Sequence, residues 1–406
     1  MSGYKLSEQF RMELKPITPV HIGGGKSYSK NEYIYLPQKN QIIIPNIPKL
    51  FGEIIERKLV DNYQEFIQSE QNKDLSIFLQ KNDIEIDAAA SWVDYTMELP
   101  DMQEEDFKQV EIAACMKNAY GEPYIPGSSL KGAIRTAILG YFAMNYKNTN
   151  PENYEKVKKK VDELANIDIT CVDADNYPRY KKAINGLKTE INQIEKECFR
   201  TMNRSGKQMD ILDDYMTTLR ISDSRPISKK DIVLTRKVDT FTNGVKNQLN
   251  LLRESLLPKE KIVFDISIDV KEKTYINKAS IDTYLQEFFK LVQDSFVSMF
   301  GLEMYTNSNL LYLGGGTGFA SKTVIYALFD KDYAREVVRR ILHFKLINER
   351  KLKEEDSDKE KPLWIQHGHD VKDNYVSPHT IKTFQIAGKN TCYDNKEMGV
   401  CECRII

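Results

Sequence analysis

Residues 125–139 place hydroxyl and cationic side chains at the start of a predicted helix. A Pro-Gly pair ends the preceding segment, and Ser128 or Ser129 can cap the new helix by accepting a backbone N–H. Lys131 and Arg135 stand four residues apart, so they share one helical face. Because a helix N-terminus carries partial positive charge and free N–H groups, this first turn is suited to holding a phosphate. A capped surface helix with two solvated cations explains the same residues equally well.

Two glycine-rich segments, residues 21–27 and 313–323, each carry a lysine. Successive glycines permit positive φ and close backbone approach, and their N–H groups can form concave nests for anions. A flexible loop is the plainer interpretation of the first segment. Together with the helix start, these segments give the candidate phosphate contacts, which are Gly23, Gly24, Gly25, Lys26, Ser128, Ser129, Lys131, Arg135, Gly314, Gly315, Gly316, Thr317 and Lys322.

The second glycine-rich segment has a rival interpretation as a nucleotide-binding loop. Residues 316–323 nearly fit G-x-x-x-x-G-K-[ST], whose backbone amides cradle phosphates. Ser321 stands where that motif requires its second glycine. No apolar strand ending in Asp follows at a distance suited to holding Mg²⁺. An NTPase is therefore the less favoured alternative.

Histidine, cysteine and carboxylate side chains are too sparsely arranged to predict a metal or catalytic centre. The H-x-H and C-x-C spacings lack the paired C-x₂-C of a structural zinc site, and alternation predicts a strand with its cysteines in the core. A ribonuclease needs a general base, for which His21 is a candidate, but Glu32 is the only carboxylate between His21 and Glu53. No catalytic residue, metal or cofactor is therefore expected. The possible metal ligands considered are His367, His369, Cys392, Cys401 and Cys403.

The composition describes a globular protein with a large core. Of 406 residues, 41% are hydrophobic, and the formal net charge is −1; mean hydropathy is −0.50. Six dispersed cysteines indicate reduced thiols, and no signal-peptide or membrane-span pattern is found, so a cytoplasmic location is expected. Residues 225–261 hold nine Lys/Arg against four Asp/Glu, whereas residues 82–111 hold one base against ten acids. We expect a basic face and an acidic insert that avoids nucleic acid.

Strands and helices must together position the candidate residues, so we expect an α+β fold. Apolar alternation predicts strands, and apolar residues at helical spacing predict helices. Predicted strands cover residues 10–14, 32–36, 41–44, 261–270 and 399–406. Predicted helices follow residue 127 and cover residues 180–199 and 280–300, the last capped by Gly301.

Three further segments lie between these elements. Residues 47–118 are predicted as a mainly helical insertion, with Phe51, Ile54, Ile55 and Leu59 on one helix. The basic residues 227–260 are predicted as an extended hairpin or a solvated loop. Charged residues 348–361 are predicted as a mobile loop.

The segment Pro126-Gly127-Ser128-Ser129-Leu130-Lys131-Gly132, followed by Arg135 and flanked by both glycine-rich segments, resembles the RAMP superfamily of CRISPR effector proteins. The long separation of the first two motifs and the Met-Gly-Val-Cys-Glu-Cys-Arg-Ile end are most similar to the fifth Csm subunits of type III-A systems. Ser222-Asp223-Ser224 is a further, short point of resemblance.

This resemblance implies two RRM-like (ferredoxin-like) modules, namely residues 1–225, with the insertion at about 47–118, and residues 226–406. It implies a non-catalytic subunit that binds guide RNA (crRNA), caps the filament of backbone subunits at the 3′ side of the crRNA and assists crRNA maturation in antiviral defence. Implied partners are crRNA, the backbone RAMP and small Csm subunits, and host nucleases. The aspartate with which the backbone subunit cuts target RNA has no counterpart here, so that activity is not carried over. A guide-processing RAMP endoribonuclease and a nucleotide-binding enzyme using residues 313–323 are the alternatives.

Overall fold

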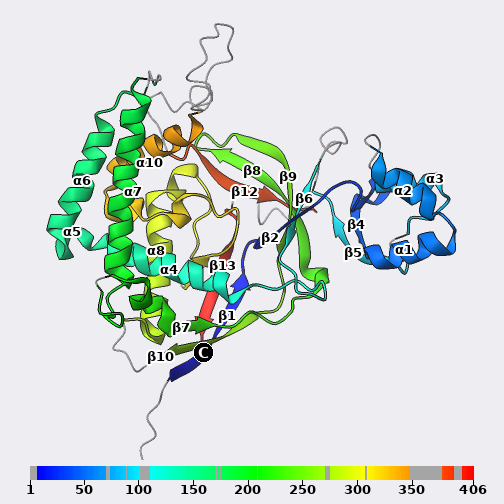
Figure 1. Ribbon diagram of the computed structural model, residues 1–406, viewed down its shortest axis with the longest axis horizontal. Helices are drawn as coiled ribbons and strands as arrows, with labels where there is room; N and C mark the ends of the chain where they lie inside the picture. The colour runs from blue at the N-terminus through cyan, green and yellow to red at the C-terminus, as the bar shows by residue number, and fades with distance from the viewer. Residues whose placement is uncertain are drawn as a thin grey trace, which may run out of the picture.

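A computed structural model describes residues 7–69, 74–87, 89–100, 110–169, 172, 175–207, 209–269, 275–306, 309–347, 377–387 and 396–406. Two five-stranded sheets and one three-stranded sheet, with helices packed around them, make up this part of the chain (Figure 1). The strands are β1 (Ser7–Pro16), β2 (Gly23–Tyr28), β3 (Ile34–Leu36), β4 (Gln41–Pro45), β5 (Val93–Glu98), β6 (Ile112–Cys115), β7 (Leu219–Ile221), β8 (Ile232–Phe241), β9 (Lys246–Leu256), β10 (Ile262–Asp269), β11 (Leu310–Tyr312), β12 (Thr380–Gln385) and β13 (Val400–Ile405). The α-helices are α1 (Ile47–Glu56), α2 (Val60–Gln68), α3 (Leu75–Lys81), α4 (Gly127–Met144), α5 (Tyr146–Thr149), α6 (Pro151–Ala165), α7 (Tyr177–Phe199), α8 (Lys278–Ser295), α9 (Ile325–Leu328) and α10 (Lys331–Leu346).

The first sheet, sheet A, has the strand order β11-β13-β1-β10-β7, with every neighbouring pair antiparallel. Alternating residues give it one buried face: Met12 lies opposite Phe264 and Leu14 opposite Ile262, and all four are buried. Helix α4 precedes β7 in the chain and helix α8 follows β10, so β1, α4, β7, β10, α8 and β11 follow the order β-α-β-β-α-β, and β13 adds a fifth strand between β11 and β1. Its segments span almost the whole sequence.

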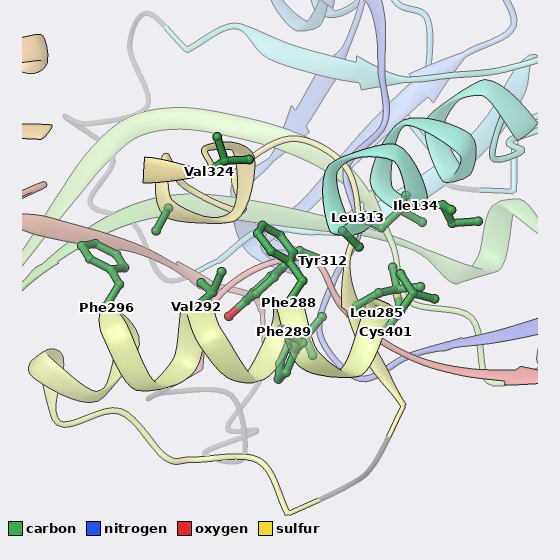
Figure 2. Packing of buried hydrophobic residues seen from close by; sticks show 14 of the residues in the cluster. Ile134, Leu285, Phe288, Phe289, Val292, Phe296, Tyr312, Leu313, Val324 and Cys401 are labelled. Carbon is green, nitrogen blue, oxygen red and sulfur yellow. The ribbon is translucent and has the colours of Figure 1, made fainter. Parts of the chain in front are cut away.

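Helices α4 and α8 pack together over the buried face of sheet A. Figure 2 shows Leu285, Phe288 and Val292 of α8 in one apolar cluster with Ile134 of α4. The helices approach closely at Gly140, where a Cβ would lie 2.2 Å from a ring carbon of Phe288. This packing fixes the position of α4, which carries the predicted phosphate site at its start.

The second sheet, sheet B, has the order β12-β8-β9-β6-β2, with β6 and β9 parallel and the other pairs antiparallel. The predicted hairpin over the basic residues is confirmed as β8 and β9, joined by a turn in which Gly244 has φ +81°. The parallel pair distinguishes sheet B from sheet A, so the two sheets are not copies of one strand order. Figure 1 shows β8, β9 and β12 curving alongside the core that α8 and α10 build.

The α+β class is confirmed, but strand pairing crosses the predicted boundary at residues 225/226. In sheet A, β1 pairs with β10 and β13. In sheet B, β6 pairs with β9. Because both sheets take strands from both sides of residue 225, the sheets do not correspond to two consecutive halves of the chain.

The insertion is a small α+β unit in which α1, α2 and α3 pack on the sheet β3-β4-β5. Figure 1 shows it projecting from the side of sheet B. The prediction of a mainly helical segment over residues 47–118 is wrong in its second half, where β5 and β6 are strands that pair with β4 and β2. Leu59 is the N-cap residue of α2 and does not belong to α1. The unit has its own core of Ile34, Ile43, Leu50, Ile54, Phe66, Leu75, Phe78, Leu79, Ile84 and Trp92.

Most remaining element predictions are confirmed. The helix predicted at 280–300 ends at Ser295 and continues as a 3₁₀ turn to Gly301, which has φ +63°. The closing strand buries Cys401 and Cys403. The predicted loop at 348–361 lies outside the described residues. In the ranges that the structure describes, no helix combines the length and apolar character needed to cross a membrane.

Candidate nucleic-acid interface

The two glycine-rich segments lie side by side, a proximity that their separation in the sequence did not indicate. The Gly315 N–H donates a hydrogen bond to the His21 carbonyl at 2.7 Å, and the two residues form an isolated β-bridge. Gly314 has φ +88°, and a Cβ there would lie 2.4 Å from the same carbonyl oxygen. Glycine is required at this position, because other residues would clash and rarely adopt that φ.

The first segment does not form the predicted loop, because residues 23–25 are the first residues of β2 and pair near Cys115 of β6. The pairing is irregular between Gly23 and Ser27, and Gly25 has φ +76°, so this start of β2 is a bulge at which glycine is favoured. Lys26 has a 60% exposed side chain and pairs with Glu32 at 3.0 Å. Burial opposes ionisation of Glu32, but hydrogen bonds from Lys26 and Ser29 outweigh it and lower the pKa of Glu32.

An aspartate occupies the helix start that was predicted to hold a phosphate. The N-cap position of α4 is Pro126, and neither Ser128 nor Ser129 caps the helix with its side chain. Instead, the Gly127 N–H donates to Asp223 Oδ1 at 2.8 Å. The carboxylate of the Ser-Asp-Ser tripeptide therefore supplies the negative charge that a helix N-terminus favours.

Lys131 and Arg135 are engaged within the protein. The Lys131 amine donates to a backbone carbonyl of β7 at 2.7 Å, and burial lowers its pKa. The Arg135 guanidinium pairs with Glu195 at 2.8 Å and Asp214 at 3.0 Å, and it lies 3.9 Å from the ring centroid of Phe199. Burial opposes its charge, but these two carboxylates outweigh burial and raise the pKa of Arg135. Both side chains tie α4 to its neighbours, which removes the physical basis for a free cationic face.

The second glycine-rich segment is a compact loop rather than a nucleotide-binding loop. The Thr317 hydroxyl donates to the Gly314 carbonyl at 3.3 Å, and the Ser321 hydroxyl donates to the Thr317 carbonyl at 3.0 Å. After the loop, the chain makes a single 3₁₀ turn to Lys322 and then the four-residue helix α9. A phosphate-binding loop leads into a longer helix whose N-terminus faces the phosphates, so the NTPase alternative lacks its structural context.

A cationic cluster of Arg253, Lys322, Lys237 and Lys382 lies beside this loop. Arg253 Nη1 lies 3.0 Å from the place that a Cβ of Gly316 would occupy. Burial and the nearby Arg253 charge lower the pKa of Lys322. Burial and the charges of Lys382 and Arg253 lower the pKa of Lys237. The cluster is therefore a place where like charges destabilise one another, and an anion would relieve them.

The charges of the cationic cluster are only partly matched by acids. Asp239 contacts Lys382 at 2.8 Å and Lys237 at 3.8 Å. Within the described ranges, neither Arg253 nor Lys322 has a carboxylate partner. Arg253 lies on β9, Lys237 on β8 and Lys382 on β12, so three neighbouring strands of sheet B present the cluster.

The possible catalytic and metal residues have structural environments. His21 Nδ1 lies 2.7 Å from the Glu254 carbonyl oxygen, and burial lowers the pKa of this histidine. Cys401 and Cys403 are buried core residues, and burial raises the pKa of both thiols, that of Cys403 to about 12. His367, His369 and Cys392 lie outside the described residues. Among the residues that are described, no three His, Cys, Asp or Glu side chains gather in a metal-binding group.

The sequence contained a signal for part of this cluster. Arg253 and Lys237 belong to the basic stretch 225–261, in which they are accompanied by Arg236 and Lys246. Nothing in the sequence indicated that Lys382 joins them, because strand pairing between β8 and β12 brings it there. The loop lysine, Lys322, is one of the candidates predicted from the sequence, and the fold places it beside Arg253.

Comparisons with known proteins agree with the sequence motifs. A family profile of the RAMP superfamily matches residues 13–321. The chain is 28% identical over 330 residues to the CRISPR system Cms protein Csm5 of Streptococcus thermophilus, covering 78% of this chain and 80% of that protein. It is 22% identical over 427 residues to the protein of the same name from Mycobacterium tuberculosis (strain CDC 1551 / Oshkosh), covering 98% and 97%.

Two solved structures share the fold. One is a chain from a cryo-EM structure of a Csm-crRNA-target RNA ternary complex of a type III-A CRISPR-Cas system, with a TM-score of 0.59 and 20% identity, covering 98% of this chain and 100% of that one. The other is the crystal structure of T. onnurineus Csm5, with a TM-score of 0.52 and 17% identity, covering 84% and 96%.

Proposed function

The chain belongs to the RAMP superfamily, and from that premise we propose that it is a non-catalytic, crRNA-binding subunit of a type III-A Csm complex. It caps the filament of backbone subunits at the 3′ side of the crRNA and assists crRNA maturation in antiviral defence. Similarity to proteins named Csm5 over most of the chain supports this choice of subunit. The fold shared with a chain of a Csm-crRNA-target RNA complex supports crRNA and other Csm subunits as partners.

The observation that carries the RNA-binding proposal is the cationic cluster. Arg253 and Lys322 have no carboxylate partner in the described part of the chain, and burial together with neighbouring cations lowers the pKa of Lys322 and of Lys237. A phosphodiester backbone is the anion that matches a row of such cations on one sheet. Phosphate contacts position RNA without identifying its bases, so we expect little sequence preference and strong salt dependence.

The two large sheets have different roles in this proposal. We interpret sheet A with α4 and α8 as an RRM-like module that forms the rigid body of the subunit. The β8–β9 hairpin and β12 then present the cationic cluster at its side. The same proposal places the protein in the cytoplasm, where the free thiols of Cys115, Cys198, Cys401 and Cys403 would stay reduced.

The non-catalytic assignment is supported by the surroundings of His21. A general base must reach the proton that it removes, and its pKa should lie near the working pH. His21 is buried, its Nδ1 is occupied by the Glu254 carbonyl, and its pKa is lowered. We therefore expect bound RNA to stay intact.

The test has two arms that use the full chain. In the first, the purified protein is titrated into single-stranded RNAs of unrelated sequence, and RNA integrity is checked on a gel. We expect similar affinities for all sequences and no cleavage. Metal-independent cleavage of repeat RNA would instead identify a guide-processing nuclease.

In the second arm, the other Csm subunits and crRNA are co-expressed with and without this chain. We expect the chain to co-purify with the complex and crRNA 3′ ends to remain longer without it. The proposed role would be refuted if the complex assembles and the crRNA 3′ ends have the same lengths whether or not this chain is present. Host nucleases that assist maturation would be identified by their co-purification with the complete complex and their loss when this chain is omitted.

A further inference from the structure

A cavity of about 360 Å³ lies between the second glycine-rich loop, the end of α10 and the start of β12. Its apolar lining includes Phe319, Leu342 and Ile381. Lys345 and Lys382 also line it, and Lys345 is exposed. The cavity therefore combines an apolar interior with cations, which is the arrangement expected for a small apolar group that carries a negative charge.

The geometry around Phe319 suits a flat ring. The Lys345 amine lies 5.3 Å from the centroid of the Phe319 ring, so one side of the ring already attracts a cation. Gly318 has φ +85°, and no atom lies within 4 Å of the place that its Cβ would occupy. The backbone beside Phe319 is therefore open to close approach by a ligand.

The cavity adjoins the cationic cluster. Lys382 belongs to both, and Asp239, which contacts Lys382 at 2.8 Å, also lines the cavity. Gly316 and Gly318 belong to one loop, with the Arg253 guanidinium near the first and the cavity at the second. A single strand whose phosphates lie along the cluster would bring a neighbouring base to the cavity.

We propose that this cavity binds one unpaired RNA base, stacked on Phe319, while Lys345 and Lys382 contact the adjoining phosphate. The proposal rests on the RNA-binding function proposed above and adds to it a base-holding position. An aromatic ring accepts any base, because every base has a π-face. The site therefore fixes the register of the strand without selecting its sequence. An apolar side chain of a partner protein is the competing occupant, and the excess of two lysines over one carboxylate, Asp239, favours the nucleotide.

The test combines variants of Phe319 with RNAs that lack one base. Single-stranded RNA is bound to the full chain, and an abasic nucleotide is moved through the RNA one position at a time. Loss of one stacked base corresponds to a roughly 5- to 150-fold weaker Kd. We expect that loss for one abasic position, for Phe319→Ala and, to a lesser degree, for Phe319→Leu, which keeps apolar bulk but lacks the ring.

The decisive result is the combination of the two changes. If the base at that position stacks on Phe319, the abasic RNA binds wild type and Phe319→Ala equally, because both partners of one contact have been removed. Phe51→Ala is the matched control, since Phe51 is a 38% exposed phenylalanine of the insertion and should leave RNA affinity unchanged. Thermal unfolding of each variant verifies that the fold is intact.

Other outcomes separate the two proposals. The base-holding site alone would be overturned if wild type binds RNA but neither Phe319→Ala nor an abasic nucleotide at any position changes the Kd. Failure of the wild type to bind any RNA would overturn both. Phe319→Ala that leaves RNA binding unchanged but weakens assembly with the other Csm subunits would assign the cavity to a protein side chain.

Discussion

Neutralising Arg253 and Lys322 together should flatten the salt dependence of RNA binding. Neither side chain has a carboxylate partner in the described ranges, so both are available to phosphates. Each phosphate contact with a single strand contributes about −0.7 to the slope of log K against log salt, so the double substitution should reduce the slope by about 1.4. Between 50 and 200 mM salt, wild type should therefore lose about sevenfold more affinity than Arg253→Gln/Lys322→Gln.

The assay is fluorescence anisotropy of a labelled single-stranded RNA at four or more salt concentrations. Lys131→Met is the control, because the Lys131 amine donates a hydrogen bond to the Leu219 carbonyl and should not contribute to the slope. Since burial disfavours both charges and the Arg253 charge further disfavours that of Lys322, the double variant should unfold at the same temperature as wild type or higher. An unchanged slope in the double variant, or an equal change in Lys131→Met, would refute the assignment of the cationic cluster.

Two further predictions concern the fold that supports this cluster. Gly127→Ala should destabilise by at least about 3 kcal/mol, through overpacking and loss of the Gly127 N–H bond to a carboxylate, because its Cβ would lie 2.4 Å from the Ser222 carbonyl oxygen. Gly132→Ala should stabilise the protein by up to about 1 kcal/mol, because no atom lies within 4 Å of the place that a Cβ of Gly132 would occupy. Denaturant titration measures the free energy of unfolding of both variants. Similar changes in the two variants would refute this reasoning. Burial lowers the pKa of His21 in the folded protein, so the unfolded chain binds more protons at mildly acidic pH. The free energy of unfolding should therefore fall as the pH drops below about 6.5, the pKa of histidine in an unfolded chain. Thermal unfolding between pH 7.5 and 5.5 should show a steeper loss for wild type than for His21→Gln, and parallel curves would contradict the burial argument.

The sequence predicted those strands and helices whose apolar residues recur at regular spacing. The alternation over residues 261–270 and the helical stripe of Leu130, Ile134, Ala137 and Ile138 both correspond to observed elements with buried apolar faces. The prediction of helix before residue 118 is wrong over β5 and β6, because these segments become strands by pairing with β4 and β2. Pairing between distant segments leaves a weak mark on the sequence of each partner.

The candidate site was harder to predict, because tertiary contacts decide which cations are paired with carboxylates and which stay available. Lys131 and Arg135 share a helical face, as their spacing required, but Lys131 donates to the Leu219 carbonyl and Arg135 pairs with Glu195 and Asp214. Arg253 sits on a strand with no special motif, and β8, β12 and the loop bring three lysines to it. A cation's availability depends on which carboxylates the fold places nearby, and that cannot be derived from the cation's own neighbours in the chain.

The glycines and the cations of this site have different physical tasks. Gly314 allows the loop to pass the His21 carbonyl at a distance that any side chain would prevent, and Gly316 adopts φ +90° where the Arg253 guanidinium lies against the loop. These glycines shape a surface on which Arg253 and Lys322 can stand close together. A chain with a net charge of −1 has no overall attraction for RNA, so binding must come from local concentration of charge. Substituting a glycine of this loop should therefore weaken RNA binding by displacing the cations, even though a glycine contributes no charge of its own.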